Sequence, residues 1–428
     1  MEKELLVSID LSGTPHFVGR LWIHERRGRE RASFEYSKEW RSLPSAFSLE
    51  PALSLGAGKF HTDKALFGSV GDSAPDRWGR MLMNRFEARE AHRKNRKAKR
   101  LKESDYLLMV DDRTRQGALR FSTSPDGSFL TSYESFPIPP LVDLEKLVSR
   151  ATKIENQDDL PSGEDLRDMF APGSSLGGAR PKAVVVDQNK NLFIAKFPSP
   201  KDEWDVELWE YVALKMAKRV WIPVPDFELQ NISGQHVLLL KRFDRDGADI
   251  RIPFLSAMSM LSANDGDRRS YLDIAEALIE HGASTRKDLE NLWRRLVFNI
   301  LVSNLDDHLR NHGFLYDQEH MGWRLSPIYD LEPLPEQVKG RYLQTCIDLE
   351  NNSASLDLAF EVAEEFSLTQ SEARKIAKEV GESTKNWRRE AEQAGAGKKE
   401  IDFMSSAFEH ENLSLALRGH TKIFQNLP

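Results

Sequence analysis

The segment that runs from Asn304 to Asn311, NLDDHLRN, concentrates side chains that can do chemistry. Asp306 and Asn311 are five positions apart, and His308 lies between them. In kinase-type phosphoryl transfer an Asp accepts the proton of the attacking hydroxyl, and an Asn a few residues later binds a metal ion. The spacing therefore predicts a catalytic loop in which Asp306 is the base.

The same segment permits two other interpretations. His308 and His312 are four positions apart, which would place both on one face of a helix. The sequence HLRNH lacks the Glu of the zinc-protease motif, but with the neighbouring aspartates a metal-dependent phosphoesterase remains open. A polar helix cap would use the same residue types, so this segment alone does not decide.

Three further segments supply parts that a phosphoryl-transfer site needs. A Gly-rich turn over 174–182 precedes a β run, and its small residues let backbone N–H groups approach a phosphate. Lys196 lies in an apolar strand, where a lysine needs a partner unless the strand is at an edge. The next helix offers Glu207 and Glu210, and Asp330 follows an apolar stretch. Each part alone has an ordinary explanation, but their order is that of a kinase.

These segments resemble the motifs of HipA-type serine/threonine kinases, the toxin half of bacterial toxin–antitoxin pairs. Ser175–Lys182 is similar to the family's S-x-x-G-A-x-x-K phosphate loop, and Asn304–Asn311 is similar to its N-x-D-x-H-x-x-N catalytic loop. The remaining matches are Lys196 with the strand lysine, Pro327–Asp330 with P-x-Y-D, Lys241–Arg245 with the R-F-D-R stretch, and Asp76–Arg80 and Gly117–Leu119 with the N-terminal region.

The resemblance implies an ATP site that also holds Mg²⁺. Asn311 and Asp330 would bind the metal ion, and Lys196 would bind phosphate with Glu210 as its ion-pair partner. Asp306, Lys196 and Asn311 form the predicted catalytic set. The predicted ATP-binding residues are Ser175, Leu176, Gly177, Gly178, Ala179, Lys182, Lys196, Glu210, Lys241, Phe243 and His308. Some family members have Glu at the hinge position where this chain has Lys241. A hinge contact through the backbone would survive this difference, whereas a side-chain contact to adenine would not.

The family resemblance also implies regulation and partners. Phosphate on Ser175, or on the adjacent Ser174, would draw the Gly-rich loop out of the ATP site and inactivate the enzyme. The expected partners are a helix-turn-helix antitoxin, operator DNA through that antitoxin, and a protein substrate such as an aminoacyl-tRNA synthetase. Two other function classes stay open: a small-molecule kinase or metal-dependent phosphoesterase, and a catalytically silent kinase fold that binds nucleic acid.

The elements around these segments predict an α+β, two-lobed kinase-like fold with a β-rich N-terminal subdomain. Short apolar runs within residues 5–37 are typical of strands, and a helical stretch follows over about 75–102. The Pro-rich FPIPP at 136–140 indicates a linker, with a helix from about Leu141. We therefore expect three regions: 1–135 as the N-terminal subdomain, 136–250 as the small lobe and 251–428 as the helical lobe.

For a β-hairpin and a long helix the sequence also predicts the residue bounds. Residues 182–186 and 192–197 form a β-hairpin across the turn 187–191, and a helix follows from about 202 to 219. Apolar residues recur at helical spacing over 285–303, with Thr285 and Asp288 resembling a capping box at its start. Arg245, with Asp246 and Gly247, is typical of a turn.

Composition limits the remaining possibilities. The chain of 428 residues has 60 Lys plus Arg and 67 Asp plus Glu, for a net charge of −7, which excludes a polybasic nucleic-acid coat. The single Cys346 cannot form an intramolecular disulfide. Apolar runs are shorter than the roughly 18 residues of a membrane helix, so we expect a cytoplasmic protein with no membrane partner. Seven basic side chains within 93–102 form either a solvated face or a phosphate-contacting patch.

Overall fold

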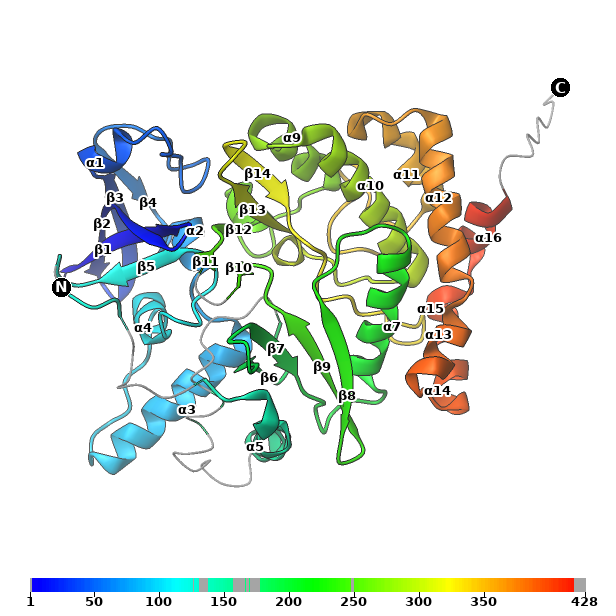
Figure 1. Cartoon of the computed structure of the whole chain (residues 1–428), viewed down its shortest axis with the longest axis horizontal. Helices are drawn as coiled ribbons and strands as arrows, with labels where there is room; N and C mark the ends of the chain where they lie inside the picture. Colours follow the sequence, from blue (N-terminus) through cyan, green and yellow to red (C-terminus); the bar gives the residue numbers. More distant parts are fainter. Residues whose placement is uncertain are drawn as a thin grey trace. The chain divides into compact units, whose positions relative to one another are not determined.

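A computed structural model of the chain describes residues 2–125, 127–130, 138–156, 166, 169, 178–247 and 250–418. The chain divides into two compact units. Unit 1 comprises Met1–Glu207, Pro225–Asp265 and Arg310–Ser326, and unit 2 comprises Leu208–Val224, Gly266–Leu309 and Pro327–Pro428. The predicted α+β class is confirmed by the elements of both units (Figure 1). The three-region division stays a prediction.

Unit 1 begins with an antiparallel sheet in the order β4-β3-β2-β1-β5 (Figure 1). Its strands are β1 (Glu2–Leu11), β2 (Thr14–Arg26), β3 (Arg29–Tyr36), β4 (Lys59–Thr62) and β5 (Leu119–Ser122). The turns Ser12-Gly13 and Arg27-Gly28 have positive φ at both residues, the backbone that two-residue hairpins favour. The predicted N-terminal strands are thus confirmed. The short helices α1 (Lys38–Arg41) and α2 (Gly68–Gly71) follow within the same region.

The helical stretch predicted for 75–102 is shorter than expected. Helix α3 (Arg77–Arg93) is capped by Asp76, whose side chain accepts the Gly79 N–H at 2.8 Å. Pro75, the first residue of the predicted stretch, therefore precedes the cap and lies outside the helix. The helix ends at Arg93, and Asn95 has a φ of 50°, which the helix cannot continue through. The next helix is α4 (Glu103–Met109).

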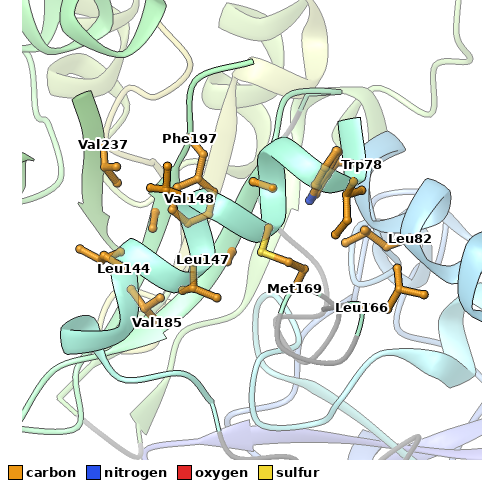
Figure 2. Close-up of a cluster of buried hydrophobic side chains, with 14 of the residues drawn as sticks. Trp78, Leu82, Leu144, Leu147, Val148, Leu166, Met169, Val185, Phe197 and Val237 are labelled. Carbon is orange, nitrogen blue, oxygen red and sulfur yellow. The ribbon is translucent and has the colours of Figure 1, made fainter. Parts of the chain in front are cut away.

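A second antiparallel sheet of unit 1 carries the predicted hairpin. Its order is β6-β7-β9-β8, with β6 (Lys182–Val186), β7 (Leu192–Lys196), β8 (Phe227–Ile232) and β9 (Gln235–Lys241). The hairpin 182–197 is confirmed. The turn η1 (Leu141–Asp143) leads into α5 (Leu144–Asn156), where a helix was expected. Figure 2 shows Leu144, Leu147 and Val148 of α5 in one cluster with Val185, Phe197 and Val237. Trp78 and Leu82 bring α3 into the same core.

The rest of unit 1 is built from short strands. They are β10 (Arg245–Asp246), β11 (Ile250–Arg251), and a sheet in the order β12-β13-β14 with β12 (Phe254–Ser256), β13 (Gly313–Asp317) and β14 (Gly322–Leu325). Helix α8 (Ala257–Met260) follows β12 directly.

Unit 2 is helical and is organised around α10 (Thr285–Val302). The apolar stripe predicted over 285–303 is confirmed, since its Leu, Trp, Val and Ile positions are all buried. The capping prediction was wrong: the cap position is Ser284, and Thr285 donates to the Leu278 carbonyl at 3.2 Å. The other helices are α7 (Val206–Arg219), α9 (Tyr271–His281), α11 (Leu356–Glu361), η3 (Ala363–Phe366), α12 (Gln370–Thr384), α13 (Trp387–Ala394), α14 (Lys398–Phe403), α15 (Ser405–Phe408) and α16 (Glu411–Arg418).

Across the ranges that the structure describes, no helix combines the length and apolar character that crossing a membrane requires.

Candidate active site

The end of α10 directs the chain into the predicted catalytic loop. Ser303 has a φ of 53°, a left-handed conformation that stops the helix. Asn304 then bonds back to Asn299 through its backbone N–H at 3.0 Å and through its side-chain amide at 3.1 Å. Its amide oxygen accepts the Glu332 N–H at 2.9 Å. Asn304 therefore fixes the start of the loop to the helix before it and to the segment that follows Asp330.

Asp307 is a buried member of a polar network. The Tyr271 hydroxyl donates to its carboxylate, and the Asn299 amide lies 3.3 Å from the same oxygen. The Thr345 hydroxyl donates to the Asp307 carbonyl at 2.6 Å. Burial raises the pKa of the Asp307 carboxyl to about 7, against hydrogen bonds from the Tyr271 hydroxyl and the Thr345 backbone N–H that lower it. Asp307 thus anchors the loop from inside unit 2.

Asp306 has the opposite environment although it is the adjacent residue. Its side chain is 50% exposed, and its carboxylate lies 3.8 Å from Lys339 Nζ. The His308 N–H donates to the Asp306 carbonyl at 2.9 Å, which folds the loop tightly at this point. Of the two aspartates, Asp306 is the one that solvent, and therefore a substrate hydroxyl, can reach.

A segment beyond Asp330 holds the loop from the other side. Leu334 N–H donates to the Ser303 carbonyl at 3.0 Å, and Arg341 donates to the Ser303 hydroxyl at 2.6 Å and to the Ile300 carbonyl at 2.9 Å. Asp330 itself lies in no strand and has a φ of 59°, a conformation that few non-glycine residues adopt. β14 ends at Leu325, so the strand does not reach Asp330 as the apolar pattern suggested.

The helical metal-site interpretation of His308 and His312 is wrong. Residues 305–308 belong to no regular element, and only a short 3₁₀ turn, η2 (Leu309–Asn311), follows. The His312 carbonyl accepts the Ala257 N–H at 2.8 Å within unit 1. In the described part of the chain, no group of three or more His, Cys, Asp or Glu side chains is arranged to hold a metal ion. An Asn–Asp ligand pair of the kinase type is a different arrangement and stays a prediction.

In unit 1, Lys196 is buried on a central strand. β7 lies between β6 and β9, and the Lys196 residue is 5% exposed, so the edge-strand interpretation is wrong. Its neighbour in the register is Lys182, which is 3% exposed and whose Nζ lies 2.9 Å from Asp76. Trp78 Nε1 donates to the Lys182 carbonyl at 3.0 Å. The Asp76–Arg80 motif therefore packs on the strand that follows the Gly-rich loop.

Only the last residues of the Gly-rich loop are among those that the structure describes. Ser174, Ser175, Leu176 and Gly177 lie outside the described residues, whereas Gly178 has a φ of 88°. Beyond Ala179, Arg180 makes two bonds of 2.6 Å with Asp202 and one of 2.9 Å with Glu207.

Of the two candidate helix carboxylates, Glu207 is thus engaged by Arg180. Burial raises the pKa of Glu207 to about 6, and the charge of Arg180 limits the rise. Glu210 is buried on the next turn of α7. The ion pair of Lys196 with Glu210 stays a prediction, as does the ATP contact of Lys182.

The R-F-D-R stretch contains a buried ion network that the sequence reading missed. Arg242 and Arg245 both bond the Asp244 carboxylate, at 2.8 Å and 2.9 Å, and the Gly117 N–H donates to it at 2.7 Å. Burial acts to raise the pKa of Asp244, but the two guanidinium groups outweigh it and hold that pKa well below its usual value. Arg245 is therefore a core residue instead of a turn residue, and the turn prediction fits only Gly247, with its φ of 65°.

This network joins two segments that were singled out separately. Arg245 also donates to the Gly117 carbonyl at 3.1 Å, so Gly117–Leu119 and Lys241–Arg245 are neighbours in unit 1. Lys241 precedes the network with its Nζ 3.7 Å from Asp226, and Phe243 lies with its ring 6.4 Å from that of Phe254. The sequence did contain a signal of this network, because Arg242, Asp244 and Arg245 carry opposite charges close together. Buried charges of this kind need to be paired.

Most of the basic side chains within 93–102 contact carboxylates of this chain. The pairs are Arg93 and Lys94 with Glu90, Arg96 with Glu87, Lys99 with Asp105 and Lys102 with Glu25. These contacts favour the interpretation as a solvated, self-paired surface over that of a nucleic-acid patch.

Comparison with known proteins gives the class of this site. The HipA-like C-terminal domain family matches residues 174–387, which is half of the chain and includes the Gly-rich loop, Lys196, the catalytic loop and Asp330. The chain belongs to this family, and the predicted resemblance to HipA-type kinases is confirmed.

Particular relatives refine the comparison. A putative kinase of Haemophilus influenzae is 25% identical over 38% of this chain and 54% of its own length. The serine/threonine-protein kinase CtkA of Helicobacter pylori is 25% identical over 37% of this chain and 51% of its own length. The match thus spans about half the length of these relatives. HipA of Shewanella oneidensis MR-1, solved with HipB and operator DNA, covers 96% of each chain at 15% identity and a TM-score of 0.65, which shows a common fold.

Proposed function

We propose that this protein is a serine/threonine kinase that transfers the γ-phosphoryl group of ATP to a protein hydroxyl. The observation that carries the proposal is the contrast between two adjacent carboxylates. Asp307 is locked in a buried network, whereas Asp306 stands half exposed on the loop that this network fixes. A base that must meet a substrate hydroxyl needs this combination of access and fixed position.

The reaction assigns a role to each predicted residue. The substrate oxygen attacks the γ-phosphorus, its proton passes to Asp306, and the bond to the β-phosphate oxygen breaks so that ADP leaves with the electron pair. Lys196 binds the phosphates, as a buried strand lysine of this type does in kinases. Backbone N–H groups of residues 175–179 contact phosphate oxygens, and Lys241 and Phe243 flank the adenine-binding hinge.

The metal-binding pair fits Mg²⁺ in its chemistry. Asn311 supplies an amide oxygen and Asp330 a carboxylate, and hard oxygen donors are what Mg²⁺ prefers. When bound, Mg²⁺ neutralises charge on the phosphates.

We further propose that the protein acts as the toxin of a toxin–antitoxin pair. The fold shared with HipA of Shewanella oneidensis, which was solved with HipB and operator DNA, supports a helix-turn-helix antitoxin and operator DNA as partners. The substrate class taken from the family resemblance is a translation enzyme such as an aminoacyl-tRNA synthetase. Phosphorylation of Ser175, or of Ser174 beside it, inactivates the enzyme, because a phosphoserine of about −1.5 to −2 charge competes with ATP for the same N–H groups.

Incubation of the purified protein with [γ-³²P]ATP, Mg²⁺ and a bacterial lysate tests the proposal. We expect label in a lysate protein and in the kinase itself, with mass spectrometry locating the latter at Ser175 or Ser174. Consumption of ATP with label only in small molecules would instead show a small-molecule kinase. Phosphate release from phosphoesters without ATP would show a phosphoesterase, and no turnover at all would favour a silent fold.

A further inference from the structure

We propose that Lys339 binds the transferred phosphoryl group beside Asp306 and is a catalytic residue of this kinase. The inference rests on the proposed function and adds a residue that none of the sequence motifs contains. Its basis is that Lys339 Nζ lies 3.8 Å from the Asp306 carboxylate and 2.9 Å from the Leu305 carbonyl.

A cation beside Asp306 would have a role in the reaction in addition to Lys196 and Mg²⁺. Negative charge on the three oxygens of the moving phosphoryl group must be stabilised in the transition state, and Lys and Arg side chains commonly do this. The catalytic loop 304–311 contains no lysine. Its one arginine, Arg310, bonds both carboxylate oxygens of Asp265, at 2.8 Å and 2.9 Å.

Lys339 is held where such a cation must be. The Leu305 carbonyl accepts a hydrogen bond from the Lys339 ammonium at 2.9 Å, and the Asp306 carboxylate lies 3.8 Å from the same nitrogen. The Lys339 side chain is 29% exposed, so it is partly covered by the protein and still reached by solvent. A phosphoryl group that receives a hydroxyl oriented by Asp306 would lie within reach of this ammonium.

The backbone around Lys339 is fixed from both sides. Two residues later, Arg341 bonds Ser303 and Ile300 at the end of α10, and Thr345 bonds the carbonyl of Asp307. On the other side, the Lys339 N–H donates to the Pro335 carbonyl at 3.3 Å. The lysine is thus preorganised on the same support as the catalytic base.

An ordinary surface ion pair is the competing explanation. Exposed pairs contribute about 0–1 kcal/mol to stability, so Lys339→Met should leave the thermal midpoint nearly unchanged under either explanation. The two explanations differ in catalysis. A surface ion pair with no part in the reaction leaves kcat and the KM for ATP unchanged, whereas contact with the phosphoryl group predicts a lower kcat with little change in that KM.

The test compares Lys339→Met, Lys339→Arg and Lys385→Met, each in the full chain. Lys385 is an exposed lysine of unit 2 that pairs with Glu382 and serves as the matched control. We expect Lys339→Met to lower kcat by about 10²–10³-fold with little change in the KM for ATP, and Lys339→Arg to restore part of it. Lys385→Met should behave as wild type.

Each other outcome has a distinct meaning. An active wild type with an unchanged kcat in Lys339→Met overturns the role of Lys339 and leaves the proposed kinase function standing. A loss of kcat that follows a fall in melting temperature, with no rescue by Arg, assigns Lys339 a structural role only and also overturns the proposal. A wild type that transfers no phosphoryl group to any acceptor overturns the proposed function itself.

Discussion

Replacing Asp307 by Asn should remove a pH dependence from the stability of this protein. Burial raises the pKa of Asp307 from 3.8 to about 7. Between these values the folded protein holds a proton that the unfolded chain releases, so the free energy of unfolding falls as pH rises. The stabilisation is complete below about pH 4 and is lost as pH rises through about 7. At about 1.4 kcal/mol for each pKa unit, the difference between the two pKa values corresponds to a change of about 4 kcal/mol in the free energy of unfolding.

Asn is a suitable replacement because it is neutral and nearly the same shape. Its amide oxygen can accept the Tyr271 hydroxyl as the carboxylate does. Asp307→Ala, in contrast, leaves the Tyr271 and Asn299 donors without this acceptor and should cost about 1–3 kcal/mol at any pH, plus the cost of a cavity.

Urea unfolding at pH 5, 6, 7 and 8, followed by tryptophan fluorescence, measures the effect. Glu207, Asp72 and Glu50 also have raised pKa values from burial, but they are present in both proteins and cancel in the difference. We expect wild type to lose stability relative to Asp307→Asn between pH 5 and 7. Parallel curves over this range would refute the assignment of Asp307 as a buried, proton-binding anchor.

Two further predictions concern the parts that support phosphate and metal binding. Asp76→Asn removes the carboxylate that faces buried Lys182 and should lower the free energy of unfolding in urea by about 3–5 kcal/mol. The double variant with Lys182→Met should recover part of this loss. Equal stability of wild type and the single variant would show that the ion pair does not stabilise the protein. Asp330→Asn should weaken Mg·ATP binding in isothermal titration because a hard-metal ligand is lost. Unchanged affinity and Mg²⁺ dependence would make Asp330 a turn residue only.

Local patterns in the sequence were sufficient for the main elements. The hairpin 182–197 and the helix over 285–302 follow from periodicity in contiguous residues, and both are confirmed. The end of α3 at Arg93 was not predicted, because the basic residues beyond it are good helix formers. Beyond Arg93 the connection is not helical, and in it Arg96 pairs with Glu87 and Lys99 pairs with Asp105.

The sequence predicted which residues belong to the candidate site, but it did not predict how buried each one is or which side chains it contacts. Nothing local distinguishes Asp306 from Asp307, since their difference depends on contacts with Tyr271, Thr345 and Lys339, which lie 33 to 38 residues along the chain from the aspartate that each contacts. The burial of Arg245 likewise depends on the Gly117 backbone. Such long-range partners carry no periodic signal, so only the three-dimensional structure identifies them.

The most direct test of the central claim is the kcat for phosphoryl transfer of Asp306→Asn and Asp307→Asn side by side with wild type. The two changes are chemically identical and affect adjacent residues, so each is the control for the other. If Asp306 is the base, its replacement should lower kcat by about 10²–10⁴-fold, whereas Asp307→Asn should stay within about tenfold of wild type. Wild-type turnover in Asp306→Asn, or a larger loss in Asp307→Asn, would contradict the assignment of Asp306 as the base of a kinase.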